Sequence, residues 1–141
     1  MKKTLYLVVV LVLLSAVVLS ACGGSSAPAT KRNNPPADIA SKTNPFAGKA
    51  DAAEAGKKLY DANCASCHGA TGKGDGPAGA ALNPHPGNLV NTVKETTPAY
   101  IYWITAEGGS AAGKSASMPA WKSILKEDQI WQVITYIQTF K

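Results

Sequence analysis

The sequence predicts an all-α domain over residues 51–141. Near the carboxyl terminus, four apolar residues repeat at the i, i+3, i+4, i+7 spacing of one helix face: Ile130, Val133, Ile134 and Ile137. A second signal is Thr97-Pro98, a hydroxyl residue followed by proline, which is typical of a helix start. No stretch alternates apolar and polar residues convincingly as a half-buried strand would. Three main helices are therefore expected.

The first of these helices is expected to begin at Asp51. An aspartate is a common N-cap, and Glu54 three residues later completes a pair that resembles a capping box. Residues on adjoining turns then form one face: Gly56, Leu59, Tyr60 and Asn63. The glycine-rich segment 69–79 that follows is predicted to be a loop, as is the proline cluster at 83–87.

The ends of the other two helices are also marked. The second helix is expected to stop at Gly108-Gly109, because glycine ends helices. The last helix carries Glu127 and Asp128 in its first turn, where the helix dipole favours negative charge.

The amino-terminal segment resembles a lipoprotein signal peptide. Lys2 and Lys3 precede an apolar run at 5–21, which is short for a membrane span and suits a signal peptide. The run ends in small residues before Cys22, as in the lipobox of bacterial lipoproteins. We expect residues 1–21 to be removed and the Cys22 thiol to be lipidated, although an uncleaved helical anchor is the alternative. Both interpretations place the rest of the chain outside the cytoplasm at the membrane surface.

Residues 22–50 are expected to be the lipidated cysteine and a flexible linker, because the segment has only Ile39 and Phe46 as large apolar residues. The formal charge of +5 falls to +3 once Lys2 and Lys3 are removed. The linker contains four cationic residues and one aspartate, so the excess positive charge lies there, where anionic lipid headgroups could attract it. No basic patch indicates a nucleic-acid partner.

The motif that carries chemistry is Cys64-Ala65-Ser66-Cys67-His68. Two thiols three residues apart on a helical turn can add to the two vinyl groups of one haem, and the adjacent histidine then lies under the iron. A disulfide would leave His68 unexplained, and a thioredoxin-like pair would need a surrounding βαβ pattern. Zinc would need more donors than the motif and His85 supply. With Cys22 lipidated, no cysteine is left over.

The second axial ligand is expected to be Met118, the only thioether left after the signal peptide is removed. It lies in a loop beside Pro119, an unusual place for a core-filling methionine, and its soft sulfur would favour ferrous iron. His85 is the competing candidate, although an exposed histidine in a proline-rich turn is the more ordinary interpretation. Two histidine ligands would lower the reduction potential.

Residues 51–141 resemble the class I cytochrome c family: three helices wrapped around one covalent haem c. The resemblance rests on the haem motif with Gly69, on the glycine-rich loop, and on Met118-Pro119-Ala120-Trp121. It implies that Gly56 and Tyr60 of the first helix cross the last helix near Val133 and Tyr136. It also implies that a proline carbonyl accepts the ring N–H of His68. The candidates are Pro77, Pro84 and Pro86. Trp121 resembles an aromatic of the haem crevice, or serves packing alone.

The expected function is one-electron transfer without a substrate of its own, because a closed six-coordinate iron changes charge with little rearrangement. The partners are then redox proteins of an electron-transport chain. The protein is either a tethered carrier or a fixed subunit of a respiratory or photosynthetic complex, for example one like the quinol-oxidising alternative complex III. A haem enzyme or a gas or redox sensor with a labile sixth ligand is the alternative. The haem domain is expected on the periplasmic side, held by the lipid anchor.

Overall fold

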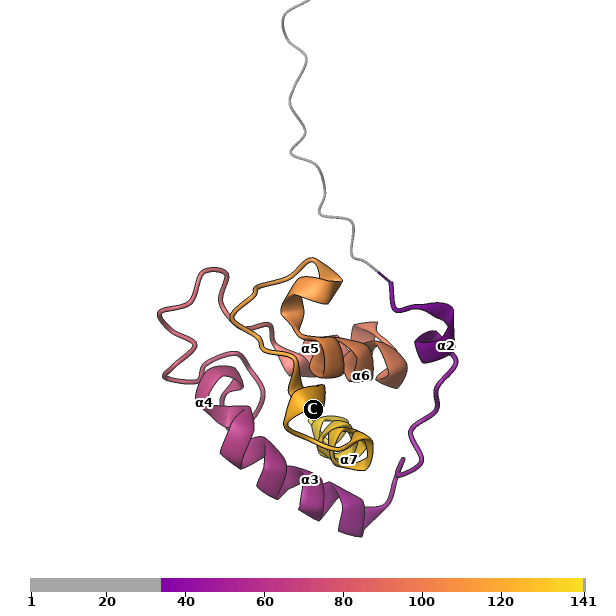
Figure 1. Cartoon of the computed structure of the whole chain (residues 1–141). Helices are drawn as coiled ribbons and strands as arrows, with labels where there is room; N and C mark the ends of the chain where they lie inside the picture. Colours follow the sequence, from indigo (N-terminus) through magenta and orange to yellow (C-terminus); the bar gives the residue numbers. More distant parts are fainter. Residues whose placement is uncertain (1–33, 141) are drawn as a thin grey trace, which may run out of the picture. The chain divides into compact units, whose positions relative to one another are not determined.

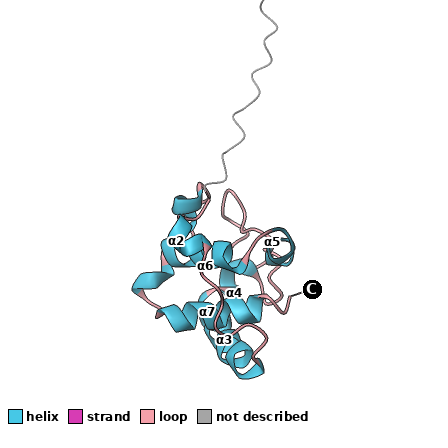
Figure 2. Cartoon of the chain, turned by 90° about the vertical axis from the view of Figure 1, so that its right-hand side faces the viewer, coloured by secondary structure: helices cyan, strands magenta, loops and turns pink. Residues whose placement is uncertain are grey.

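The computed structural model describes residues 34–140 (Figure 1). The predicted signal peptide, Cys22 and the first part of the predicted linker lie outside these residues. The described chain is helical and has no strand (Figure 2), which confirms the all-α prediction. Its α-helices are α2 (Ala37–Ala40), α3 (Ala50–Asn63), α4 (Ala65–His68), α5 (Leu89–Glu95), α6 (Pro98–Glu107) and α7 (Glu127–Ile137). Two 3-10 turns, η2 (Gly109–Ala112) and η3 (Trp121–Ser123), lie between α6 and α7.

Helix α3 lies across α7 at Gly56 (Figure 1). A Cβ atom at this position would overlap the carbonyl of Gln132, so only glycine lets the two backbones approach so closely. One turn on, the ring of Tyr60 is fully buried beside Val133 and meets Tyr136 edge to face, with ring centroids 5.4 Å apart. The crossing that the family resemblance implies is therefore confirmed.

Helix α6 forms the centre of the core, and all residues from Ala99 to Ala106 are buried. Its start is as predicted, because the Thr97 hydroxyl accepts a hydrogen bond from the Tyr100 N–H at 3.2 Å. It ends before Gly108, whose φ of 84° is unfavourable for other residues. The side of α6 that faces α7 stacks Tyr102 on Trp131, with ring centroids 4.4 Å apart.

The start of α3 differs from the prediction. The helix begins at Ala50, its N-cap is Lys49, and no side chain caps it. A preceding turn, in which the Lys49 N–H donates to the Phe46 carbonyl at 3.0 Å, already sets the direction of the chain. Asp51 consequently lies inside the first turn, where its charge still suits the helix dipole. Glu54 pairs with Lys58 at 3.2 Å instead of reaching back to the cap.

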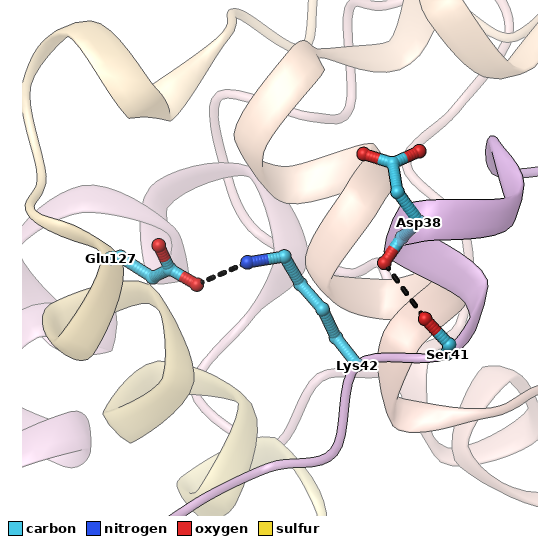
Figure 3. Close-up of polar contacts among 4 residues, drawn as sticks. All are labelled: Asp38, Ser41, Lys42 and Glu127. Carbon is cyan, nitrogen blue, oxygen red and sulfur yellow. Dashed lines mark hydrogen bonds and ion pairs between the residues drawn. The ribbon is translucent and has the colours of Figure 1, made fainter.

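The linker prediction is wrong for residues 37–49, which we call the strap. Ile39 and Phe46 pack against the core cluster that α6 and α7 share. Lys42 forms an ion pair with Glu127 at 2.6 Å (Figure 3), and the Asn44 amide donates to the Thr135 hydroxyl at 3.0 Å. Two apolar side chains are too few to fold a segment alone, but they suffice to dock it on a core formed by other elements.

Helix α5 was not predicted. The Asn88 side chain caps it by accepting from the Asn91 N–H at 3.3 Å, and Val90 is its buried residue. With one buried side chain in seven residues, the helix has no periodic pattern long enough to be recognised.

Candidate functional site

The Cys64–His68 motif forms a single helical turn that follows α3 almost without a break. Cys64 ends α3 by donating its N–H to the Tyr60 carbonyl at 2.8 Å, and the His68 N–H returns to the Cys64 carbonyl at 2.9 Å. This turn places both thiols and the imidazole on one short element. The two cysteines are half-buried and are not joined by a disulfide.

The thiol of Cys64 is poorly suited to redox or nucleophilic chemistry of its own. Burial, with a smaller contribution from the neighbouring Cys67, raises its pKa to about 12. Because the thiolate is the reactive form, burial suppresses the reactivity of this thiol at neutral pH. A thioredoxin-like site is therefore not supported.

A glycine-rich loop, residues 69–79, closes around the motif. The Gly74 N–H donates to the His68 carbonyl at 2.8 Å, and the Ala78 N–H donates to the Ser66 carbonyl at 2.9 Å. A Cβ atom at Gly76 would lie 2.7 Å from the Ala65 carbonyl, so a side chain there would push the loop off the motif. The Tyr60 hydroxyl anchors the loop by donating to the Gly69 carbonyl at 2.7 Å.

The ring of His68 is half-buried and oriented by a backbone carbonyl. Its Nδ1 lies 3.4 Å from the Gly87 carbonyl, which can only accept, so Nδ1 carries the proton. Burial lowers the pKa of His68 and favours the neutral ring, which leaves Nε2 with a lone pair available to a metal. The expectation of Pro77, Pro84 or Pro86 as acceptor is therefore wrong. The partner is the residue after Pro86, and its carbonyl has no signature in the sequence.

Met118 lies in the loop between η2 and η3, residues 113–120, which we call the Met118 loop. Its side chain is half-buried against an apolar cluster on α6 and η2: Tyr100, Trp103, Ile104 and Ala112. This cluster is separate from the one shared by α6 and α7. The thioether is therefore held in an apolar environment rather than displayed to solvent.

Two candidates remain, His85 and Trp121. His85 is exposed, and its Nδ1 is 3.2 Å from the Gly79 carbonyl. Trp121 packs against the core cluster shared by α6 and α7 rather than against the cluster that holds Met118, which supports the packing interpretation. Within residues 34–140, no three His, Cys, Asp or Glu side chains gather as a metal-binding cluster.

One buried polar atom tests whether a haem suits this environment. The Tyr100 hydroxyl belongs to the same cluster as Met118, and among the described residues it has no hydrogen-bond partner. A buried hydroxyl without an acceptor is costly, and a haem brings carboxylates that could accept from it. The donors also fit, since two thiols, an imidazole and a thioether are the groups that hold haem c. Sequence reasoning missed Tyr100 because nothing distinguishes it from other core aromatics of α6.

The fold and the motif define a c-type cytochrome domain with a single haem. Residues 51–137 match the family model described as cytochrome c oxidase, cbb3-type, subunit III, and the chain belongs to this family. The chain is 39% identical over 88 residues to cytochrome c6 of Leptolyngbya boryana. The matched residues make up 62% of this chain and 91% of that protein.

Two oxidase subunits are also similar. The cbb3-type cytochrome c oxidase subunit FixP of Rhizobium meliloti (strain 1021) is 31% identical over 90 residues, or 60% of this chain. Subunit CcoP of Azospirillum brasilense is 31% identical over 104 residues, or 72% of this chain. The chain spans only 26% and 32% of these two proteins.

Membership of the family establishes the cofactor and the type of reaction. The chain binds one haem c covalently, with its iron, and transfers electrons. Within residues 34–140, no helix is long and apolar enough to cross a membrane.

Proposed function

We propose that Cys64 and Cys67 attach the haem, that His68 and Met118 are the axial ligands of its iron, and that the protein is an electron carrier rather than an enzyme. The observation that carries this proposal is the state of His68. Its Nδ1 is held by the Gly87 carbonyl and its ring is partly buried, so Nε2 is free and oriented. Outer hydrogen bonds of this kind fix the tautomer of a metal-bound histidine.

When bound, haem c supplies a one-electron couple at its iron. The chain supplies the rest. Cys64 and Cys67 would fix the position of the group, His68 would offer Nε2 to its iron, and the apolar residues beside Met118 would exclude water. Two protein ligands would leave no coordination position for a substrate, which supports electron transfer over catalysis.

The surroundings favour Met118 over His85 as the second ligand. Met118 packs in an apolar cluster with the buried Tyr100 hydroxyl, whereas His85 is exposed and its ring contacts the Gly79 carbonyl. A thioether favours ferrous iron and raises the reduction potential.

Replacement of Met118 by histidine tests this assignment. Met118→His should retain the fold and lower the reduction potential, because imidazole donates more strongly than a thioether and stabilises ferric iron. The expected fall is a few multiples of about 59 mV, each of which is a tenfold change in the equilibrium constant. The measurement is a redox titration followed by absorbance, with His85→Ala as control. If His85 is the ligand, His85→Ala alone will change the spectrum.

We further propose that the domain is held on the extracytoplasmic side of the membrane by lipid on Cys22 and exchanges electrons with membrane-bound redox proteins. FixP and CcoP, which are named as oxidase subunits, support a partner in a membrane complex. The 91% coverage of cytochrome c6 supports a domain that acts as a carrier in its own right. Purification in mild detergent separates the two arrangements: a fixed subunit will copurify with a large complex at constant stoichiometry, whereas a tethered carrier will separate from it.

A further inference from the structure

The Met118 loop is joined to the carboxyl-terminal end of α6. The Gly109 N–H donates to the Met118 carbonyl at 3.0 Å, and the Gly109 carbonyl accepts from the Lys114 N–H at 2.8 Å. A Cβ atom at Gly108 would lie 3.0 Å from the Met118 carbonyl and 3.0 Å from the Ala120 nitrogen. The backbone that carries Met118 therefore rests directly on the end of α6.

An ion pair also joins the end of α6 to η3. Glu107 is the last residue of α6, and its carboxylate lies 2.5 Å from the Lys122 ammonium, fifteen residues on in η3. Glu107 precedes the Met118 loop in the sequence and Lys122 follows it, so the ion pair links the two segments that flank the loop. The side chains are 31% and 56% exposed, so the pair is partly shielded from water on the Glu107 side.

The helix dipole makes the two partners unequal. The carboxyl-terminal end of α6 carries partial negative charge, which disfavours Glu107 and favours a cation beside it. Lys122 thus neutralises both the carboxylate and the end of the helix. Loss of Lys122 leaves the Glu107 carboxylate beside the partial negative charge at the end of α6. Loss of the Glu107 charge instead leaves Lys122 beside a helix end that still attracts it.

We propose that Glu107 and Lys122 are positioning residues that clasp the Met118 loop and so keep the thioether on the iron. The inference rests on the proposed role of Met118 as axial ligand. An external ligand such as carbon monoxide can reach the iron only when Met118 moves away. Breaking the clasp raises the population of the open loop and therefore the rate of carbon monoxide binding, without altering the haem attachment at Cys64 and Cys67.

The test compares Glu107→Gln and Lys122→Met in the reduced holoprotein. Both should bind carbon monoxide faster, by about two- to fivefold at low salt, as expected for a partly exposed ion pair. Lys122→Met should have the larger effect. High salt should reduce the difference from wild type. The exchanged pair, Glu107→Lys with Lys122→Glu, should return the rate to near that of the wild type.

Glu54→Gln is the matched control, because it breaks the exposed ion pair between Glu54 and Lys58 on α3, away from the loop. Its rate should equal that of the wild type. A methionine–iron absorption band in the ferric wild type reports the ligand itself. If that band is present and neither single variant binds carbon monoxide faster, the proposed clasp is contradicted and the assignment of Met118 as ligand stands. If the band is absent from the wild type, both the ligand assignment and the clasp are overturned.

Discussion

The hydroxyls of Tyr60 and Tyr100 are both buried, but only one of them has a hydrogen-bond partner among the described residues. The Tyr60 hydroxyl donates to the Gly69 carbonyl, and burial raises the pKa of Tyr60 far above its usual value. The Tyr100 hydroxyl has no hydrogen-bond partner among the described residues, and the residue is only 6% exposed. A stable fold rarely leaves such a group unsatisfied. A haem carboxylate is the acceptor that the cofactor would bring.

Tyr100→Phe tests this at the level of one atom. If the hydroxyl donates to a haem carboxylate, its removal should destabilise the holoprotein by about 1.5–3 kcal/mol, the range for a hydrogen bond to a charged group. The reduction potential should also fall, because a less neutralised carboxylate favours ferric iron. Denaturant unfolding and redox titration measure the two effects. Tyr60→Phe serves as the control for the loss of a buried hydrogen bond, because it loses the bond to the Gly69 carbonyl and should also lower the stability. A Tyr100→Phe protein as stable as the wild type would contradict the hydrogen bond.

The strap shows how an element of weak sequence signal acquires a position. Ile39 packs against two core clusters, and Phe46 packs against one of them. The ion pair of Lys42 with Glu127 raises the pKa of Lys42 and lowers that of Glu127, chiefly through their hydrogen bond. Both groups are exposed, so most of the docking energy comes from the apolar contacts.

Phe46→Ala should therefore release the strap more than any loss of its charges. The expected cost is about 1–2 kcal/mol in the free energy of unfolding, because the ring is only half-buried. Limited proteolysis should then cut within residues 37–49 while the rest of the domain resists. Thr43→Ala, at an exposed position of the same strap, is the control and should be cleaved at the rate of the wild type. Equal cleavage rates for Phe46→Ala and wild type would show that the strap does not depend on this ring.

At the scale of the whole molecule, the strap shortens the predicted tether. The linker expected over residues 22–50 loses residues 37–49 to the packed domain. For the remaining residues 23–36, a coil of the predicted kind would have an end-to-end distance of about 20 Å. If Cys22 is lipidated as proposed, a tether of this length would keep the haem domain close to the membrane surface.

Cys22→Ala tests the anchor independently of the haem site. The predicted lipobox would use only this thiol, so the variant should be either an uncleaved precursor or a soluble protein loaded with haem. Membrane fractionation, haem spectra and mass spectrometry of the amino terminus distinguish these forms. Mature protein with a cleaved, acyl-free amino terminus that still sediments with membranes would contradict the lipid anchor.

Local sequence signals were enough to predict the helical class, the ends of α6, the start and apolar face of α7, and the covalent haem motif. These features depend on interactions between near neighbours: helix periodicity, the Thr97 cap, the stop at Gly108, and two thiols on one turn. The crossing at Gly56 was accessible as well, through the family resemblance.

The tertiary structure alone decided which groups meet across the chain. It placed the Gly87 carbonyl beside His68, docked the strap through Ile39 and Phe46, and brought Glu107 to Lys122. The N-cap of α3 is Lys49 instead of the expected Asp51, because a local turn from Phe46 to Lys49 precedes the helix. A carbonyl has no residue identity, and an ion pair or a docked ring depends on distances between remote segments. Local patterns specify helices, whereas the surroundings of the haem ligands arise only when those helices pack.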